Sequence, residues 1–264
     1  MERLELAEAE PNVRFNEAFR LLRPESGGEW RELGGGKVIF SGPGSPLSQA
    51  LGLGLRGPIG PGLLDEVEEL LGRGGGPVVV SLLPCADASL SQALAQRGYA
   101  LAEFNQVLVR DLASKGWSAT PRVRPMERGE ELLFNRTVMA GFLEKESVEP
   151  AEAELFQAIT TAASTVCFLA KEGDRALGAG SVCIHDEVAI LSGTSVLPSA
   201  RGRGLHRELI DARLAYAAQA GCTLATSSTL PASGSQRNLE RAGFRVAYCK
   251  AMMSKSGSAP PPQQ

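Results

Sequence analysis

The chain lacks the features of several large protein classes. It has two histidines and five cysteines among 264 residues, and no two cysteines are spaced as C-x-x-C. Too few ligands lie at usable spacing for a zinc site, so we expect no metal. No stretch reaches the ~20 apolar residues of a membrane-spanning helix, and the acidic start, Met1 to Pro11, has no apolar signal-peptide core. We therefore expect a cytoplasmic protein with no membrane partner.

An excess of positive charge is also missing. The formal net charge is −3, and the lysines and arginines are scattered along the sequence. A protein that binds the phosphate backbone of nucleic acid needs a basic stripe, so we expect no nucleic-acid partner. The hydrophobic content is 43% over 264 residues, which can fill one large core or two smaller ones. The length favours two domains.

The second part of the chain shows helix and strand periodicities in the order βααβββαβαβ. Short strands separated by turn-forming residues predict an antiparallel meander, which a longer helix follows. The predicted elements are a strand at 122–125, helices at 130–143 and 150–163, strands at 166–170, 178–184 and 188–196, a helix from 205 to Gly221, a strand at 223–229, a helix at 235–242 and a strand at 245–252.

The first part of the chain ends in a similar βαβαβ order. The predicted elements are a strand at 51–55, a helix at 63–71, a strand at 78–83, a helix at 89–96 and a strand at 102–109. Ser91 to Tyr99 aligns with Ser235 to Phe244 with one residue of slip, which we interpret as an internal repeat. The alternative is that any helix ending in Gly-aromatic before a strand would match. The linker is predicted at Ala113 to Thr120.

These patterns predict a domain at 1–115, a second at 116–253 and a disordered tail at 254–264. The tail consists mainly of Ser, Gly, Pro and Gln and cannot bury enough apolar surface to order itself.

The segment Val196 to Arg207 lies between a predicted strand and a predicted helix and has the features of an anion site. Gly202 and Gly204 allow the backbone to curve around a phosphate, and the start of a helix offers free amides. Three arginines, at 201, 203 and 207, oppose the helix macrodipole unless an anion is bound there. No Gly-Lys-[Ser/Thr] follows the glycines, and short antiparallel strands precede the motif, so neither a P-loop nor a dinucleotide fold fits.

This segment closely resembles the signature of the GNAT superfamily of acyl-CoA N-acyltransferases. The family pattern is Arg or Gln, two residues, Gly, one residue, then Gly or Ala, after a strand and a proline. Arg201, Gly204, Val196 and Pro198 fit this pattern, whereas His206 replaces a small residue. The order of elements over 121–252 also matches the family, so the resemblance covers roughly half the chain.

The resemblance implies an α/β (α+β) protein with two GNAT-like domains, the first degenerate. Each domain would have a mixed, mostly antiparallel, twisted sheet flanked by helices. By the same resemblance, acetyl-CoA would be the co-substrate: the backbone of one strand would pair with its pantetheine arm, and the loop amides would wrap its pyrophosphate. The implied residues are Thr194, Ser195, Val196, Arg201, Gly202, Arg203, Gly204, Leu205, His206 and Arg207. The His206 imidazole would lie either on the helix surface or against a phosphate.

The positions that carry acid and base chemistry in well-known relatives are changed here. The acidic base falls at Ser227, the asparagine that contacts the cofactor at Ala232 and the proton-donating tyrosine at Leu239. The catalytic residues are therefore unknown, with Ser227 and Ser235 as weak candidates. Ser235 would otherwise be a helix N-cap.

The predicted function is N-acetyl transfer to an amine of a small molecule or a peptide, which would work mainly by proximity. The alternatives are an acyl-CoA-binding regulatory module without turnover and a purely structural tandem domain. Glu144, Glu146 and Glu149 would form either an amine-attracting cluster or a plain exposed loop. We expect a monomer with pseudo-dimeric domains or a homodimer.

Overall fold

A computed structural model describes residues 1–113, 117, 120–154 and 157–256. The chain divides into two compact units. Unit 1 is Met1–Val107 together with the chain from Tyr248, and unit 2 is Leu108–Ala247. The two unit boundaries fall within strand β5 (Ala100–Asp111) and strand β11 (Arg245–Lys255), so each of these strands contributes to both units.

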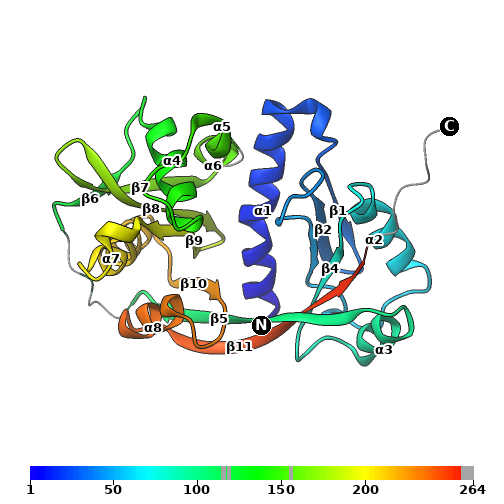
Figure 1. The fold of residues 1–264 in the computed structure, drawn as a ribbon. Coiled ribbons are helices and arrows are strands. Elements are labelled where there is room, and N and C mark those ends of the chain that lie inside the picture. Colours follow the sequence, from blue (N-terminus) through cyan, green and yellow to red (C-terminus); the bar gives the residue numbers. More distant parts are fainter. Residues whose placement is uncertain (114–116, 118–119, 155–156, 257–264) are drawn as a thin grey trace. The chain divides into compact units, whose positions relative to one another are not determined.

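Unit 1 is a sheet with the order β1-β2-β3-β4-β11, with helices on both faces (Figure 1). Strands β3 and β4 are parallel, and the other neighbours in this unit are antiparallel. Its other elements are α1 (Glu2–Leu22), η1 (Pro24–Ser26), β1 (Glu29–Leu33), β2 (Gly36–Phe40), β3 (Gln49–Leu51), α2 (Leu63–Gly72), β4 (Val78–Leu82) and α3 (Ala88–Gln96).

The two faces of unit 1 follow the alternation of side chains along β2. Ile39 packs with Ala9 and Val13 of α1 on one face. The residues before and after it, Val38 and Phe40, pack with α2 on the other face. Successive side chains on a strand point to opposite faces, so one apolar strand supplies two cores.

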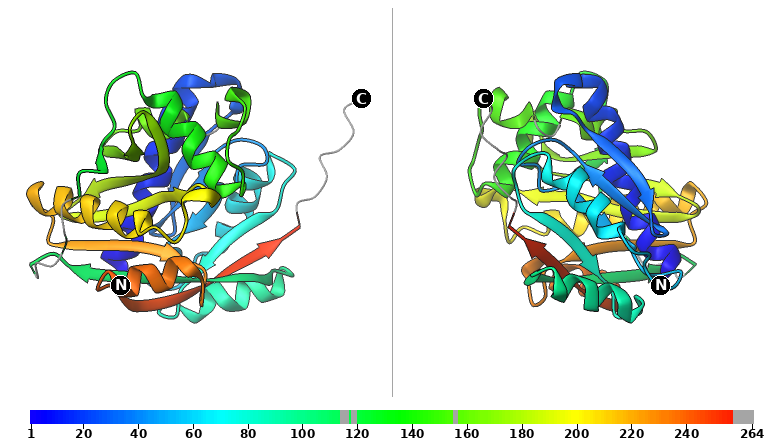
Figure 2. Two further views of the ribbon diagram at one scale, coloured as in Figure 1. Left: turned by 60° about the vertical axis from the view of Figure 1, so that its left-hand side comes forward. Right: turned by 90° about the vertical axis from the view of Figure 1, so that its right-hand side faces the viewer.

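Unit 2 is a sheet with the order β6-β7-β8-β9-β10-β5. Strands β6 to β9 form an antiparallel meander, and β10 is parallel to β9. Helices α4 and α7 cover opposite faces of this sheet (Figures 1 and 2). The other elements are β6 (Val123–Pro125), α4 (Glu131–Phe142), α5 (Pro150–Ala153), α6 (Gln157–Thr161), β7 (Thr165–Glu172), β8 (Arg175–His185), β9 (Val188–Val196), η3 (Pro198–Ala200), α7 (Leu205–Gln219), β10 (Leu224–Thr229) and α8 (Gly234–Arg241).

Close packing of α4 on β9 depends on a glycine. A Cβ added to Gly141 would lie 2.6 Å from the Cβ and the Oγ of Ser195. On the other face, Leu205, Leu209 and Leu214 of α7 are buried in the main core of unit 2. Helix α7 ends before Gly221, whose φ of 87° suits the position after a helix.

The predicted fold class is confirmed, and the elements of unit 2 lie close to their predicted bounds. The helix predicted at 150–163 is two short helices, α5 and α6, with residues 155–156 outside the described part. Much of the predicted linker at 113–120 also lies outside it. Of the predicted tail, residues 254 and 255 belong to β11, and residues 257–264 are not described.

The strand predicted at 51–55 is wrong beyond its first residue. Strand β3 ends at Leu51, because Gly52 and Gly54 adopt φ values of 74° and 71° that break the extended backbone. The sequence analysis also did not predict α1, β1 and β2.

The helices α3 and α8 end in the same way, as the aligned sequences suggest. After α3, the amides of Gly98 and Tyr99 donate to the carbonyls of Ala95 and Leu94. After α8, the amides of Gly243 and Phe244 donate to the carbonyls of Glu240 and Leu239. Both closures are Schellman-type caps built on a glycine with positive φ.

Candidate functional site

The segment between β9 and α7 has the backbone geometry of an anion-binding loop. Gly202 and Gly204 have φ values of 74° and 82°, which glycine adopts without strain. Gly204 is the N-cap of α7, and no side chain caps this helix. The amides of the first helical turn therefore lack the usual acceptor, and the positive end of the macrodipole lies at the same place.

The loop is open on the side of its glycines. A Cβ added to Gly202 would meet no atom within 4 Å, and one added to Gly204 would meet Glu208 Oε1 at 3.8 Å. Residues 201 to 204 are exposed, whereas Leu205 is buried and fixes the start of α7. A phosphate can thus approach the backbone without displacing a side chain.

All three arginines in the loop region form ion pairs with carboxylates that are not in the loop. Arg201 Nη1 and Nη2 lie 2.6 and 2.9 Å from the carboxylate oxygens of Glu144. Arg207 Nε lies 2.8 Å from Asp211 Oδ2, one helical turn further along α7. The guanidinium of Arg201 holds the pKa of Glu144 below its usual range. These cations are present at the loop, but an incoming anion has to compete with the carboxylates for them.

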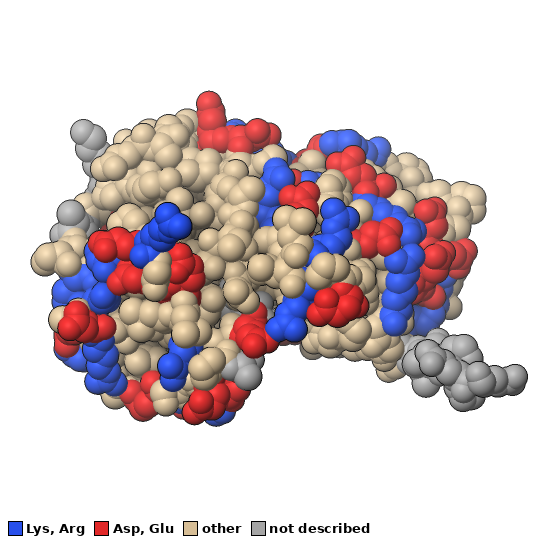
Figure 3. Space-filling model, turned by 90° about the horizontal axis from the view of Figure 1, so that it is seen from above, with Lys and Arg blue, Asp and Glu red and all other residues tan. Residues whose placement is uncertain are grey.

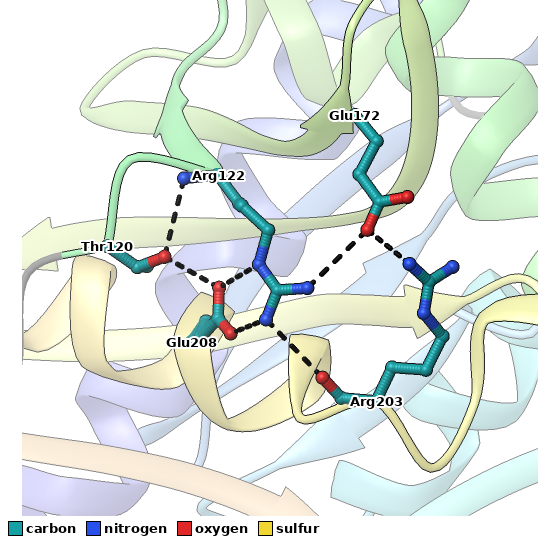
Figure 4. Close-up of polar contacts among 5 residues, drawn as sticks. All are labelled: Thr120, Arg122, Glu172, Arg203 and Glu208. Carbon is teal, nitrogen blue, oxygen red and sulfur yellow. Dashed lines mark hydrogen bonds and ion pairs between the residues drawn. The ribbon is translucent and has the colours of Figure 1, made fainter.

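The third arginine belongs to a network that ties the loop to β6 and β7 (Figure 4). Arg203 and Arg122 both contact Glu172 at the end of β7. Arg122 Nη2 also donates to the Arg203 carbonyl at 3.4 Å, and Arg122 Nε lies 3.1 Å from Glu208 Oε2. Thr120 Oγ1 donates to the same oxygen of Glu208 at 2.7 Å. Glu208 would repel a phosphate at the helix start, and Arg122 balances its charge.

The predicted acceptor carboxylates are largely engaged by the loop. Glu144, at a φ of 58°, pairs with Arg201. Glu146 accepts from the Ser199 amide at 2.7 Å and from its hydroxyl at 2.6 Å. Glu149 is exposed. Glu144 and Glu146 therefore link the α4 to α5 connection to the segment between β9 and α7, and an amine-attracting role for the three carboxylates stays a prediction.

Strands β9 and β10 separate shortly after they begin. Their parallel register runs from Val188 to Ile190 on β9, with Thr226 opposite Ile190. The next contact is a side chain, because Ser227 Oγ donates to the Leu191 carbonyl at 2.9 Å. Among the described residues the register of β9 with β10 extends no further, while the other edge of β9 pairs with β8 as far as Val196. One edge of the strand before the loop is therefore open to a ligand.

The strand residues that the GNAT resemblance assigns to the pantetheine arm and the thioester, Thr194, Ser195 and Val196, lie at the end of β9. Thr194 is half-buried. Ser195 is buried, and its hydroxyl donates to the Val138 carbonyl of α4 at 3.0 Å. The Val196 carbonyl accepts from Arg201 Nε at 3.3 Å. The structure thus leaves the backbone of β9, rather than the Ser195 hydroxyl, as the part that could pair with a ligand.

A family model described as the acetyltransferase (GNAT) family matches residues 133–244, from α4 to the end of α8. This range contains β9, the loop and α7. The match covers less than half of the chain.

Solved GNAT structures share the fold of the chain. A GCN5-related N-acetyltransferase from Kribbella flavida is 18% identical, with a TM-score of 0.62, and the match covers 93% of this chain and 96% of that one. A tandem GNAT protein from the clavulanic acid biosynthesis pathway is 16% identical, with a TM-score of 0.58 and coverage of 86% and 80%. A GCN5-related N-acetyltransferase from Sphaerobacter thermophilus is 13% identical, with a TM-score of 0.53 and coverage of 71%. The chain spans 62% of that protein, less than two thirds of its length. A comparison with curated proteins found no match.

His206 replaces the small residue of the GNAT pattern, and its imidazole is largely buried rather than spread on the helix surface. Burial, together with the charge of Arg213, lowers the pKa of His206 to about 4. Its Nδ1 has no hydrogen-bond partner among the described residues. In this arrangement only the backbone amide of His206, and not its imidazole, could donate to an anion in the loop.

The candidate catalytic positions of the GNAT region have mostly structural roles. The Ser227 hydroxyl bridges β10 to β9. Ser233, not Ser235, is the N-cap of α8, because Ser233 Oγ accepts from the Gln236 amide at 3.1 Å. The N-cap interpretation of Ser235 is therefore wrong. Leu239 is buried in the core of unit 2.

The residues that hold the loop in place were not among the predicted site residues. Arg122 and Glu172 lie 81 and 31 residues before Arg203 in sequence, and neither belongs to a motif. Arg213 lies within α7, and no motif singles it out. No spacing signal could have linked these residues to the loop, since the fold alone brings them together.

In the described part of the chain, no group of three or more His, Cys, Asp or Glu residues could hold a metal ion. No helix among those residues is long and apolar enough to cross a membrane. On the face drawn in Figure 3, basic and acidic side chains are intermixed, so that face has no basic stripe.

Proposed function

We propose that the chain is an N-acetyltransferase that transfers the acetyl group of acetyl-CoA to an amine of a small molecule or a peptide. The observation that carries this proposal is the uncapped start of α7 at Gly204, next to the open edge of β9. Free amides, two left-handed glycines and Arg201 coincide there, which suits a pyrophosphate. The match of residues 133–244 to the GNAT family supports acyl transfer.

In this proposal, the pyrophosphate of acetyl-CoA takes the loop amides from Gly202 to Arg207, and its pantetheine arm pairs with the open edge of β9. The amine nitrogen attacks the thioester carbonyl carbon. A C–N bond forms, the C–S bond breaks, and the sulfur leaves as the CoA thiolate. The proton lost by the amine passes to water.

The reaction relies mainly on orientation, because the described residues place no tyrosine or carboxylate at the usual positions. Ser227 is bound to β9 and Leu239 is apolar. Holding amine and thioester together can supply ~7–11 kcal/mol of the barrier. The rate should therefore depend strongly on how much of the amine is deprotonated.

The first half of the chain is, in the same proposal, a degenerate copy that does not bind acetyl-CoA. The matching closures of α3 and α8 support a repeat. The likeness to a solved tandem GNAT protein supports it as well.

Two matched variants test the site. Gly204→Asp adds a Cβ and a negative charge at the start of α7, whereas Gly62→Asp makes the same change at the start of α2, where φ is 84°. Calorimetric titration with acetyl-CoA should show a Kd raised more than tenfold in Gly204→Asp and unchanged in Gly62→Asp. Unchanged affinity in a folded Gly204→Asp variant would overturn the site.

Turnover is tested by release of free CoA from acetyl-CoA with a panel of small and peptide amines. Release that requires an amine supports the proposed enzyme. Tight binding without release for every amine would contradict it and favour an acyl-CoA-binding module.

A further inference from the structure

Arg213 is an unusual residue for the interior of unit 2. It lies on α7 and is 1% exposed, the largest of the fully buried side chains. Its guanidinium makes hydrogen bonds to three backbone carbonyls: Nε to Leu209 at 2.8 Å, and Nη1 to Ser181 at 3.0 Å and to Ser192 at 3.3 Å. Among the described residues no carboxylate pairs with it. A buried cation without a counter-charge is costly, and an apolar side chain would fill this space at lower cost.

The cation lies at an irregularity in the sheet. Strands β8 and β9 pair Ala179 with Ser195 and then Ser181 with Ser192. One residue on β8, Gly180, therefore faces two on β9, residues 193 and 194, which is a β-bulge.

Gly180 makes room for the guanidinium at this bulge. A Cβ on Gly180 would lie 3.1 Å from the Cζ and Nη1 atoms of Arg213, and 3.3 Å from Thr194 Oγ1. Gly193 takes a φ of 59°, which favours glycine. Two glycines and an arginine thus adapt both strands to the bulge.

The bulge occupies the stretch of β9 that the proposed function assigns to the thioester. A bulge re-aims the backbone groups of a strand, and the Nη1 bonds to Ser181 and Ser192 fix the last regular pair beside it. The carbonyl oxygen of a thioester gains negative charge when an amine attacks. A positive charge held in a low-dielectric interior stabilises such an oxyanion more than one in water does.

We propose that Arg213 is a positioning residue for acyl transfer, which holds the bulge at Gly193 and Thr194 and keeps a fixed positive charge behind the strand where the oxyanion forms. This role rests on the proposed function. Burial lowers the pKa of His206, seven residues earlier on α7, and the charge of Arg213 lowers it further.

The test compares Arg213→Met with Arg213→Lys and with a control, Arg110→Met. Arg110 is also a buried arginine of unit 2, and it donates to a backbone carbonyl, that of Ala242, which lies outside β8 and β9. Kinetics with the best amine of the panel give kcat, and calorimetry gives the Kd of acetyl-CoA.

We expect Arg213→Met to lower kcat at least tenfold while the Kd of acetyl-CoA changes less than threefold, because the phosphate loop is intact. Arg213→Lys should recover part of kcat, and Arg110→Met should keep it. Gly180→Ala crowds the guanidinium but keeps its charge, and it should lower kcat as well. If Arg213→Met does not fold, Gly180→Ala alone tests the role of Arg213.

A kcat within twofold of the wild type in Gly180→Ala or in folded Arg213→Met would overturn this role. So would an equal loss of kcat in Arg110→Met. If the wild-type chain binds acetyl-CoA but releases no CoA with any amine, the proposed function itself fails, and the failure is visible before any variant is made.

Discussion

Helix α2 of unit 1 and helix α7 of unit 2 begin in the same way. Their N-caps are Gly62 and Gly204, with φ values of 84° and 82°, and no side chain caps either helix. In each unit the strand before the loop is parallel to the strand after the helix, β3 to β4 and β9 to β10. The backbone plan is shared, so any difference in binding has to come from the residues around it.

The loop of unit 1 lacks donors that the loop of unit 2 has. Pro58 and Pro61 have no amide hydrogen, and Asp65 and Glu66 add negative charge to the first turn of α2. Arg56 pairs with Glu2 at 2.7 Å. We therefore predict that a helix start alone does not make an anion site and that the preceding loop has to supply amides as well.

The segment after β3 is also covered by the start of the chain. Leu4 of α1 packs with Leu55 against the cluster that contains Leu83 and Tyr248. Tyr248 donates its hydroxyl to the Glu5 carboxylate at 2.9 Å, so it is not available as a general acid. Unit 1 uses its polar groups for stability, whereas those around the loop of unit 2 remain partly exposed.

The largest effect should come from breaking the buried charge cluster of unit 1. Lys250 Nζ lies 3.1 Å from the nearest oxygens of Glu5 and 2.8 Å from Glu8 Oε2, and all three side chains are at most 7% exposed. Lys250→Met leaves two buried carboxylates without a cation, which should lower the free energy of unfolding by about 3–5 kcal/mol. Urea denaturation measures this change.

Lys255→Met is the control on the same strand. Its pair with Glu68 is 34% and 23% exposed, so we expect a loss of less than about 1 kcal/mol. Equal losses in the two variants would contradict a stabilising role for the buried cluster.

A smaller effect is expected from His206 of unit 2. The folded state holds the pKa of His206 at about 4, below its unfolded value of 6.5. Between pH 6.5 and 4, His206 is therefore protonated in the unfolded chain but mostly neutral in the folded one. The free energy of unfolding falls as the pH is lowered through this range. When the pH is lowered from 7 to 4, the free energy of unfolding should fall by up to about 3 kcal/mol more in the wild type than in His206→Gln. Parallel pH profiles in urea denaturation would show that the imidazole is not buried.

The smallest effect is expected at the loop cations. Arg201→Gln should raise the Kd of acetyl-CoA about fivefold, because a charge-assisted contact is lost that already competes with Glu144. Arg56→Gln, the equivalent change in unit 1, should leave the Kd within twofold. Calorimetry at two salt concentrations measures the Kd of acetyl-CoA for both variants. A similar rise of the Kd in the two variants would contradict the proposed difference between the units.

The sequence alone predicted the elements that are locally coded. Helix α7, strand β9 and the loop between them follow from apolar spacing and from glycines at 202, 204 and 221. Helix α1 could not be predicted in the same way, because Pro11 lies inside it and Glu5 and Glu10 point into the interior. Long-range burial overrides local propensity there.

The candidate site was predictable in its backbone but not in its electrostatics. The glycines and the helix start indicated the loop, whereas the carboxylates that pair with Arg201 and Arg203 are 57 and 31 residues away in sequence. The N-cap of α8 was placed two residues too late, at Ser235, because Ser233 and Ser235 look alike in sequence. Only the fold distinguishes them.

The central claim is that the start of α7 binds acetyl-CoA and the start of α2 does not. Its most direct test is the stoichiometry of acetyl-CoA binding to the full-length chain, measured by calorimetric titration together with the Gly204→Asp and Gly62→Asp variants. We predict one site per chain, lost in Gly204→Asp and kept in Gly62→Asp. Two sites per chain, or a single site that survives Gly204→Asp and disappears in Gly62→Asp, would contradict the account.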